Sequence, residues 1–128
     1  MALWNLKLSG ATTRVRGNAA EEAALAHLQA AGLTLVERNY RTPGRGGGEI
    51  DLVMREAGGT LVFVEVRARA ATTHGGAAAS VGGVKQRRIV LAARHYLMRH
   101  RSPPACRFDV VAIDGNHIEW LKAAFDAA

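Results

Sequence analysis

The amino-acid sequence predicts an α/β protein, with helices packed on a central mixed β-sheet. Two segments have the apolar spacing of a helix, and the remaining regular segments have the β-branched content or the alternation of strands. The predicted order is helix, three strands, helix, two strands. Because helices are interleaved with strands, we expect an α/β sandwich around one sheet.

One domain accounts for the whole chain. It has 128 residues, 48% of them hydrophobic, which is enough for one hydrophobic core. We expect residues 16–128 to form this domain and residues 1–15 to be a flexible N-terminal tail. No apolar run is long enough to span a membrane, and the start lacks the pattern of a signal peptide. The single cysteine, Cys106, allows no internal disulfide, so we expect a cytoplasmic protein in which this thiol is buried.

The first helix is expected to run from Asn18, as its N-cap, to Ala31, with Gly32 ending it. Residues 33–39 follow as a short strand. Residues 40–48, which are rich in Gly and Arg, are expected to form a flexible loop.

The next two strands form a hairpin in the sequence GEIDLVMREAGGTLVFVEVRAR. Its turn is predicted at Ala57–Gly59. If this is a three-residue loop with Gly in the left-handed position, Glu56 faces Thr60. Counting back along both strands then places Asp51 directly opposite Glu65 on one face.

The facing carboxylates of Asp51 and Glu65 predict a metal site in the hairpin. Two carboxylates at this separation repel each other, and burial increases the repulsion. A divalent cation with oxygen ligands would relieve it, and Arg67, on the same face as Glu65, adds a fixed positive charge. The alternatives are a capping role for Asp51 and an edge-strand ion pair with an arginine for Glu65.

A third carboxylate, that of Glu21, comes from the first helix. The residues at i+3, i+4 and i+7 are Ala24, Leu25 and Leu28, so Glu21 lies on or beside the face that packs on the sheet. The alternative is an acid that is favoured near the helix N-terminus by the macrodipole. Taken together, three acids on converging faces favour a metal site.

The second half of the chain adds a helix and two strands. Residues 70–83 are small and include four glycines, so we expect a mobile loop. A helix is expected over residues 84–100, and two prolines after it end it. Its expected buried stripe is Ile89, Ala92, Ala93, Tyr96 and Leu97. Strands are expected over residues 106–114 and 117–121, and a short helical turn is expected to close the chain.

The charge of the chain favours a polyanionic partner. The formal net charge is +6, and no Asp or Glu occurs in residues 66–108. An unbalanced block of this length creates a field of one sign, for which nucleic acid is the natural partner. A solvated basic face is the alternative. The basic residues of this block are Arg67, Arg69, Lys85, Arg87, Arg88, Arg94, Arg99, Arg101 and Arg107.

Three stretches together resemble the YraN-like family of bacterial endonuclease-like proteins. These are GNAAEEAALAHLQAAGLTLVERNYR, GEIDLV with VFVEVRAR, and VKQRRIVLAARHYL. The family is similar to archaeal Holliday junction resolvases in the PD-(D/E)XK nuclease superfamily. The resemblance implies a restriction-endonuclease-like αβββαβ core. It makes Asp51 and Glu65 the motif acids, Glu21 the helix acid, and the carbonyl of Val66 a further metal ligand.

The chain departs from the family pattern at Arg67, where lysine is usual. In such nucleases the lysine helps to position or activate the attacking water. Arginine can bind phosphate through two hydrogen bonds, but it stays protonated and cannot act as a general base. Three alternatives follow: the metal alone generates the nucleophile, Lys85 on the next helix reaches the site, or the protein binds nucleic acid without cutting it.

Basic residues around the hairpin are candidate nucleic-acid contacts. Some lie in the Gly-rich loop before it, and others open the second helix, where a solvated turn is the alternative. His74 is the histidine placed to contact a phosphate. The candidate set is Arg41, Arg45, Arg69, His74, Lys85, Arg87 and Arg88.

These observations favour a cytoplasmic, Mg²⁺- or Mn²⁺-dependent endonuclease acting on DNA, with branched or damaged DNA among its candidate substrates. Asp51, Glu65 and Arg67 are the expected catalytic residues. The alternative is a non-catalytic nucleic-acid-binding protein that keeps the nuclease scaffold, and a third reading is a domain that binds an acidic protein. A homodimer is compatible with the resemblance. No membrane partner is expected, because the basic segment lacks a wide apolar stripe.

Overall fold

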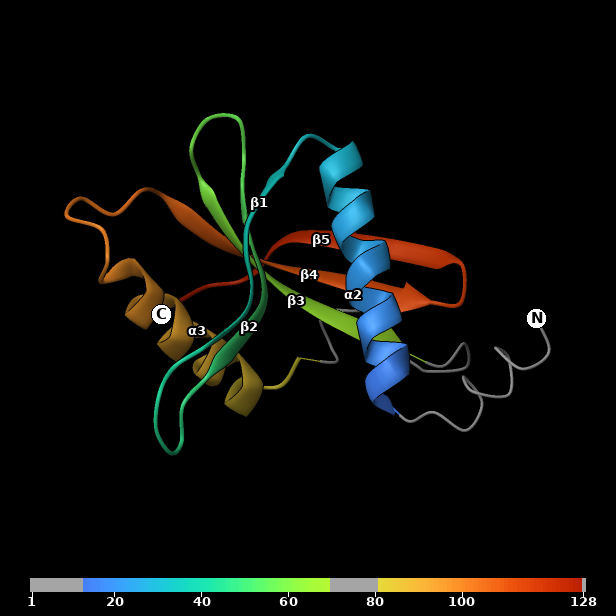
Figure 1. Ribbon diagram of the computed structural model, residues 1–128, viewed down its shortest axis with the longest axis horizontal. Coiled ribbons are helices and arrows are strands. Elements are labelled where there is room, and N and C mark those ends of the chain that lie inside the picture. The colour runs from blue at the N-terminus through green and yellow to red at the C-terminus, as the bar shows by residue number, and fades with distance from the viewer. Residues whose placement is uncertain (1–12, 70–80, 128) are drawn as a thin grey trace.

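Two helices and five strands follow one another in residues 13–69 and 81–127, which the computed structural model describes (Figure 1). Along the chain they are α2 (Thr13–Ala30), β1 (Thr34–Arg41), β2 (Glu49–Arg55), β3 (Leu61–Arg69), α3 (Gly83–Leu97), β4 (Cys106–Asp114) and β5 (His117–Phe125). The expected order of helices and strands is therefore confirmed.

The five strands form one mixed sheet in the order β1-β2-β3-β4-β5. Neighbouring strands are antiparallel except β3 and β4, which run parallel. A parallel pair needs a crossover connection, and α3 lies in the connection between these two strands. This arrangement confirms the α/β fold with a central mixed sheet and is consistent with an αβββαβ nuclease-like core.

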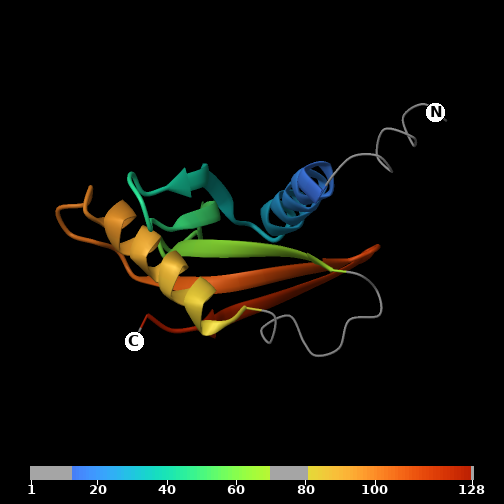
Figure 2. The same ribbon diagram turned by 90° about the horizontal axis from the view of Figure 1, so that it is seen from below.

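The two helices cover opposite faces of the sheet. In Figure 2, α2 lies above the strands and α3 crosses in front of them. Side chains alternate along a strand, so Val62 and Val64 of β3 join the core under α2, whereas Leu61 and Phe63 join the core under α3. Because both faces are covered, the start of β3 is a continuous apolar run.

Each helix packs through residues at helical spacing. The buried residues of α3 are Ile89, Ala92, Ala93 and Tyr96, as expected, whereas Leu97 is only partly buried. The helix ends at Leu97 rather than at residue 100. Within the part of the chain that the structure describes, neither helix is long and apolar enough to cross a membrane.

The loop between β1 and β2 is tied to α3. Arg88 donates two hydrogen bonds, of 3.1 and 3.0 Å, to the carbonyl oxygen of Gly47. The amide of Gly48 donates to Oγ1 of Thr42 at 2.8 Å. A Cβ at Gly48 would lie 1.8 Å from the carbonyl oxygen of Arg88, so only glycine permits this approach. The loop expected to be flexible thus fixes the start of β2 beside the first turns of α3.

The first helix begins earlier than expected. Helix α2 starts at Thr13, so Asn18 lies inside it, exposed, and the expected N-cap is wrong. Asn or Gly inside a helix costs only about 1 kcal/mol or less of helix stability relative to Ala. Such a residue therefore does not end a helix when the residues on both sides of it are helical. The expected tail falls mainly on residues 1–12, which lie outside the described residues.

The last strand is longer than expected and replaces the predicted helical turn. Strand β5 continues to Phe125, whose ring stacks on Phe108 at a centroid distance of 5.1 Å. A register shift in β4 lets the pairing continue past Asp109. The buried carboxylate of Asp109 accepts hydrogen bonds, both of 2.9 Å, from Nε1 of Trp120 and the amide of Ala123. This carboxylate therefore holds β5 in place where its regular pairing is interrupted.

Two smaller expectations are also corrected. Strand β1 extends to Arg41, since the ring of Tyr40 is buried against that of Tyr96 of α3. Cys106 is exposed rather than buried, because it is the first residue of β4 and lies at the end of the core. The loop expected over residues 70–83 falls mostly on residues 70–80, outside the described residues.

Candidate active site

The hairpin of β2 and β3 has the predicted turn and register. The amide of Glu56 donates to the carbonyl of Thr60 at 2.9 Å, and Gly59 has a φ of 99°. Val53 pairs with Phe63, and Leu52 pairs with Val64. Continued by one residue, this register brings Asp51 opposite Glu65, as the sequence predicts.

The carboxylate of Asp51 lies where β2 separates from β3. The backbone pairing of β2 with β3 ends at Leu52, whereas β3 stays paired with β4 to its end at Arg69. At the separation, Oδ2 of Asp51 accepts a hydrogen bond of 2.8 Å from the amide of Val66. The side chain thus replaces a backbone partner and is held next to Glu65.

Glu65 is a buried carboxylate with an incomplete set of partners. The residue is 3% exposed, and its Oε1 has no hydrogen-bond partner. Burial, and then the charge of Asp51, raise the pKa of Glu65 to about 7. Burial also raises the pKa of Asp51. When both carboxylates are ionised, Oε1 of Glu65 has no hydrogen-bond donor. Either a proton shared with Asp51 or a bound cation is therefore needed at this oxygen.

Two basic side chains contact the other oxygen of Glu65. Nη1 of Arg67 lies 3.6 Å from Oε2, and Nζ of Lys85 lies 3.5 Å from it. Lys85 comes from the first turn of α3, which the loop before β2 holds in place. The helix lysine of the second alternative therefore contacts Glu65, while its role stays a prediction.

Glu21 lies near Asp51 but outside a common cluster. Burial, and then the charge of Asp51, raise the pKa of Glu21, and an oxygen of Glu21 lies 3.7 Å from Nη2 of Arg38. By alternation Asp51 shares the face of Val53, under α3, whereas Glu21 comes from α2 on the opposite face. In residues 13–69 and 81–127 no three His, Cys, Asp or Glu side chains are close enough to hold one metal ion.

The remaining basic candidates are spread over three places. Arg41 and Arg45 are exposed at and after the end of β1, and Nη2 of Arg41 lies 3.9 Å from an oxygen of Glu49. The guanidinium of Arg88 binds Gly47, so its hydrogen bonds hold the loop. Strand β3 ends at Arg69, and the last candidate, His74, lies outside the described residues.

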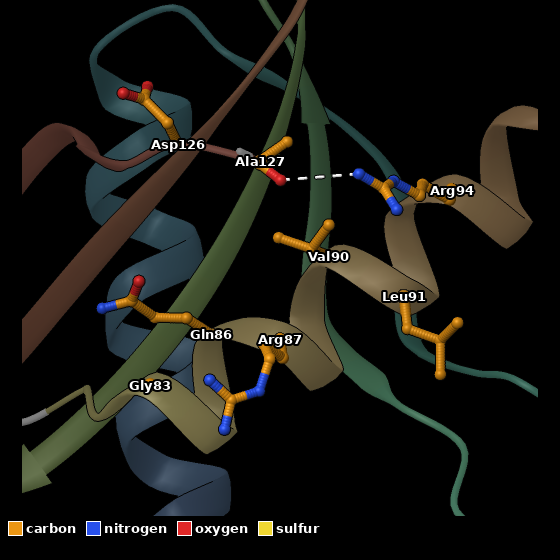
Figure 3. Close-up of a pocket in the computed structure, with 8 residues that line it drawn as sticks. All are labelled: Gly83, Gln86, Arg87, Val90, Leu91, Arg94, Asp126 and Ala127. Carbon is orange, nitrogen blue, oxygen red and sulfur yellow. Dashed lines mark hydrogen bonds between the residues drawn. The ribbon is translucent and has the colours of Figure 1, made fainter.

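Arg87 lines a groove of about 530 Å³ beside α3, and neither Asp51 nor Glu65 is among the lining residues (Figure 3). Val90, Leu91 and Arg94 of the same helix also line this groove. Nη2 of Arg94 donates to the carbonyl of Ala127 at 3.5 Å, the bond drawn in Figure 3. The groove is therefore separate from the carboxylate pair.

Two residues near the site were missed in the sequence. Arg38 of β1 makes ion pairs with Glu21 and with Glu22, the latter at 2.7 Å. Glu49 also raises the pKa of Asp51, more weakly than burial does, because its charge lies two residues along the same face. Alternation in β2 was enough to find Glu49, whereas no local pattern connects β1 to α2.

The class of protein is defined by the αβββαβ order and by the carboxylate pair at the end of the central hairpin. It is an α/β protein consistent with a nuclease-like core. The chain belongs to the UPF0102 family: the family model described as "Uncharacterised protein family UPF0102" matches residues 20–113. This confirms the resemblance to the YraN-like proteins.

Relatives match nearly the whole chain. A UPF0102 protein of Acidovorax sp. (strain JS42) is 68% identical over 91% of this chain and 89% of its own length. A UPF0102 protein of Albidiferax ferrireducens is 64% identical over 99% of both chains. One of Methylibium petroleiphilum is 68% identical over 91% of this chain and 98% of its own.

Proposed function

We propose that this protein is a metal-dependent nuclease that hydrolyses phosphodiester bonds of DNA. The observation that carries the proposal is the buried pair of Asp51 and Glu65, in which Oε1 of Glu65 has no partner. Two ionised carboxylates at this position repel each other at neutral pH. A divalent cation between them would satisfy the free oxygen and remove the repulsion.

The residues present fit Mg²⁺ or Mn²⁺. Mg²⁺ is commonly held by one or two carboxylates and by substrate phosphate, and it keeps several waters. Asp51 and Glu65 would supply the carboxylates, and the carbonyl of Val66 would add a backbone ligand. Glu21 would contribute negative charge from α2. When bound, the ion would lower the pKa of a water molecule and neutralise charge on the phosphate.

Nucleic acid is the substrate that the charge of the chain favours. The net charge is +6, and exposed arginines stand at the end of β1 (Arg41) and in the loop before β2 (Arg45). Arg67 is 35% exposed at its side chain, so its guanidinium can bind two oxygens of a phosphate while contacting Glu65. A cytoplasmic location is part of the proposal, because DNA is available there.

The test is cleavage of labelled duplex, flap, four-way junction and single-stranded DNA in Mg²⁺ or Mn²⁺. Wild-type protein should cut at least one of these and stop in EDTA. Asp51→Asn and Glu65→Gln, which keep the size of each side chain, should each lower the rate by at least about 10²-fold. Unchanged metal-dependent cleavage by Asp51→Asn would rule out the proposed site.

A second candidate is a DNA-binding protein that does not cut, and Arg67 in place of lysine favours it. Such a protein would bind DNA equally in EDTA and in Mg²⁺, with the salt dependence of phosphate contacts. Binding without cleavage of any of the four DNA structures would select this candidate.

A further inference from the structure

We propose that Lys85 of α3, rather than Arg67 of β3, is the cation that acts on the attacking water at the carboxylate pair. This inference rests on the proposed nuclease function. It assigns the task of the strand lysine to a residue 18 positions later in the chain, on a different element. Arg67 is left to bind the phosphate.

The geometry places both cations at one oxygen. Nζ of Lys85 and Nη1 of Arg67 lie 3.5 and 3.6 Å from Oε2 of Glu65. They come from different elements, because Arg67 follows Glu65 on β3 and Lys85 lies in the first turn of α3.

Lys85 influences both carboxylates. Its positive charge lowers the pKa of Asp51 and that of Glu65. At Glu65 the influence of Arg67 is the smaller of the two. The ammonium contacts Glu65 directly, and from this position it can orient a water molecule between the carboxylate and a phosphate.

The backbone under Lys85 is anchored on both sides. Nε2 of Gln86 donates to the carbonyl of Val81 at 2.9 Å, and Arg88 binds Gly47 across the helix. Ile89, in the next turn, is buried in the core. The side chain of Lys85 is 37% exposed, so its ammonium is positioned by a fixed helix and still open to a substrate.

The two side chains differ in what they can bind. An ammonium is a compact charge with three donors, so Lys85 can bind Glu65 and donate to a water and to a phosphate oxygen at once. A guanidinium is a planar fork suited to two oxygens of one phosphate. In the hydrolysis the water oxygen bonds to phosphorus and the ester P–O bond breaks. The water proton leaves to solvent and the leaving oxygen takes one from solvent, while Lys85 stays charged.

The experiment compares Lys85→Met, Lys85→Arg and Arg67→Met, with Lys122→Met as a matched control on exposed β5. Mn²⁺ affinity is measured by calorimetry without DNA. Lys85→Met should bind Mn²⁺ about tenfold more tightly, because a positive charge beside the ligands is removed. Lys85→Arg and Lys122→Met should keep the wild-type affinity. A merely structural lysine would instead weaken Mn²⁺ binding and lower the melting temperature together.

Single-turnover cleavage at saturating DNA then separates the two cations. Lys85→Met should lower the rate constant by about 10²-fold with little change in DNA affinity. Arg67→Met should mainly weaken DNA binding. The inference is overturned if Lys85→Met leaves Mn²⁺ affinity unchanged, or if Arg67→Met has the larger effect on the rate constant. If wild-type protein cuts no DNA, the nuclease proposal fails and this inference fails with it, whereas cleavage that Lys85→Met leaves unchanged overturns this inference alone.

Discussion

At the scale of single residues, the carboxylate of Glu65 is placed at a cost to stability. Its pKa is raised from 4.5 to about 7 because the charged form is buried beside Asp51. Such a shift corresponds to about 3 kcal/mol of unfolding free energy at pH values above 7. A carboxylate kept in such a position is typical of a functional site.

The pH dependence of stability follows from this shift. Between about pH 4.5 and 7 the folded state holds a proton on Glu65 that the unfolded chain releases, so the free energy of unfolding falls as pH rises. Glu65→Gln removes this group and should be more stable than wild type at pH 8, by up to about 3 kcal/mol, with little difference at pH 4.5. Urea unfolding of both proteins at the two pH values measures it. A Gln variant that is less stable at pH 8 would contradict the assignment.

Metal binding should compete with that proton. At pH 8 the carboxylate pair is ionised, so Mg²⁺ or Mn²⁺ at 100 times its dissociation constant should stabilise the protein by about 2.7 kcal/mol. At pH 5 the proton on Glu65 should remove most of this effect. Thermal unfolding with and without metal tests it, and Asp51→Asn serves as the control that should not respond. Equal stabilisation of wild type and Asp51→Asn would place the metal elsewhere.

At the scale of elements, the connection between β1 and β2 determines how the site is held together. It fixes β2, which carries Asp51, and through Arg88 it also fixes the helix that carries Lys85. These two elements are far apart in the sequence, and the contact of Gly48 with the backbone of Arg88 brings them together. The glycine-rich loop therefore acts as a structural clamp between the two sides of the site.

A methyl group at Gly48 should open this clamp. Its Cβ would lie 1.8 Å from the carbonyl oxygen of Arg88, which is backbone and cannot move aside without shifting α3. Gly48→Ala should therefore destabilise the protein by about 2 kcal/mol or more. Gly58→Ala is the matched control, because a Cβ there meets nothing within 4 Å. Chemical denaturation of both variants measures the two free energies of unfolding. Equal stability of the two variants would contradict this role of Gly48.

The hairpin was predictable from the sequence because its constraints are local. A turn with glycine at Gly59 fixes the register of β2 on β3, and alternation then fixes which side chains share a face. The start of α2 and the length of β5 were not predictable in this way. The length of β5 depends on contacts between strands, such as the bonds from Trp120 and Ala123 to the carboxylate of Asp109.

At the scale of the whole molecule, the two helices supply the groups that the sequence could not place. The face of Glu21 on α2 could be predicted from helical spacing, but its distance from Asp51 depends on how α2 lies across the sheet. Arg38 pairs with Glu21 from a strand 17 residues later, and the sequence offers no signal for that pairing. Lys85 could be proposed only as one of three alternatives, because its reach depends on the docking of α3.

The strand order also places two basic side chains at opposite edges of the sheet. The loop with Arg45 follows β1, at one edge of the sheet, and Lys122 lies on β5, at the opposite edge. Only the first edge adjoins β2 and its Asp51. If DNA binds over the carboxylate pair, the phosphate contacts should come from the β1 side.

Salt dependence of DNA binding tests this placement without any cleavage. In EDTA, the logarithm of the binding constant should fall linearly with the logarithm of salt concentration. Arg45→Ala should weaken binding for all DNA sequences and reduce the slope by about 1, because one phosphate contact is lost. Lys122→Ala also removes one positive charge, but Lys122 lies on the opposite edge of the sheet. The salt-dependence slope of this variant should therefore match that of wild type. A larger change for Lys122→Ala would move the DNA to the β5 side and away from Asp51 and Glu65.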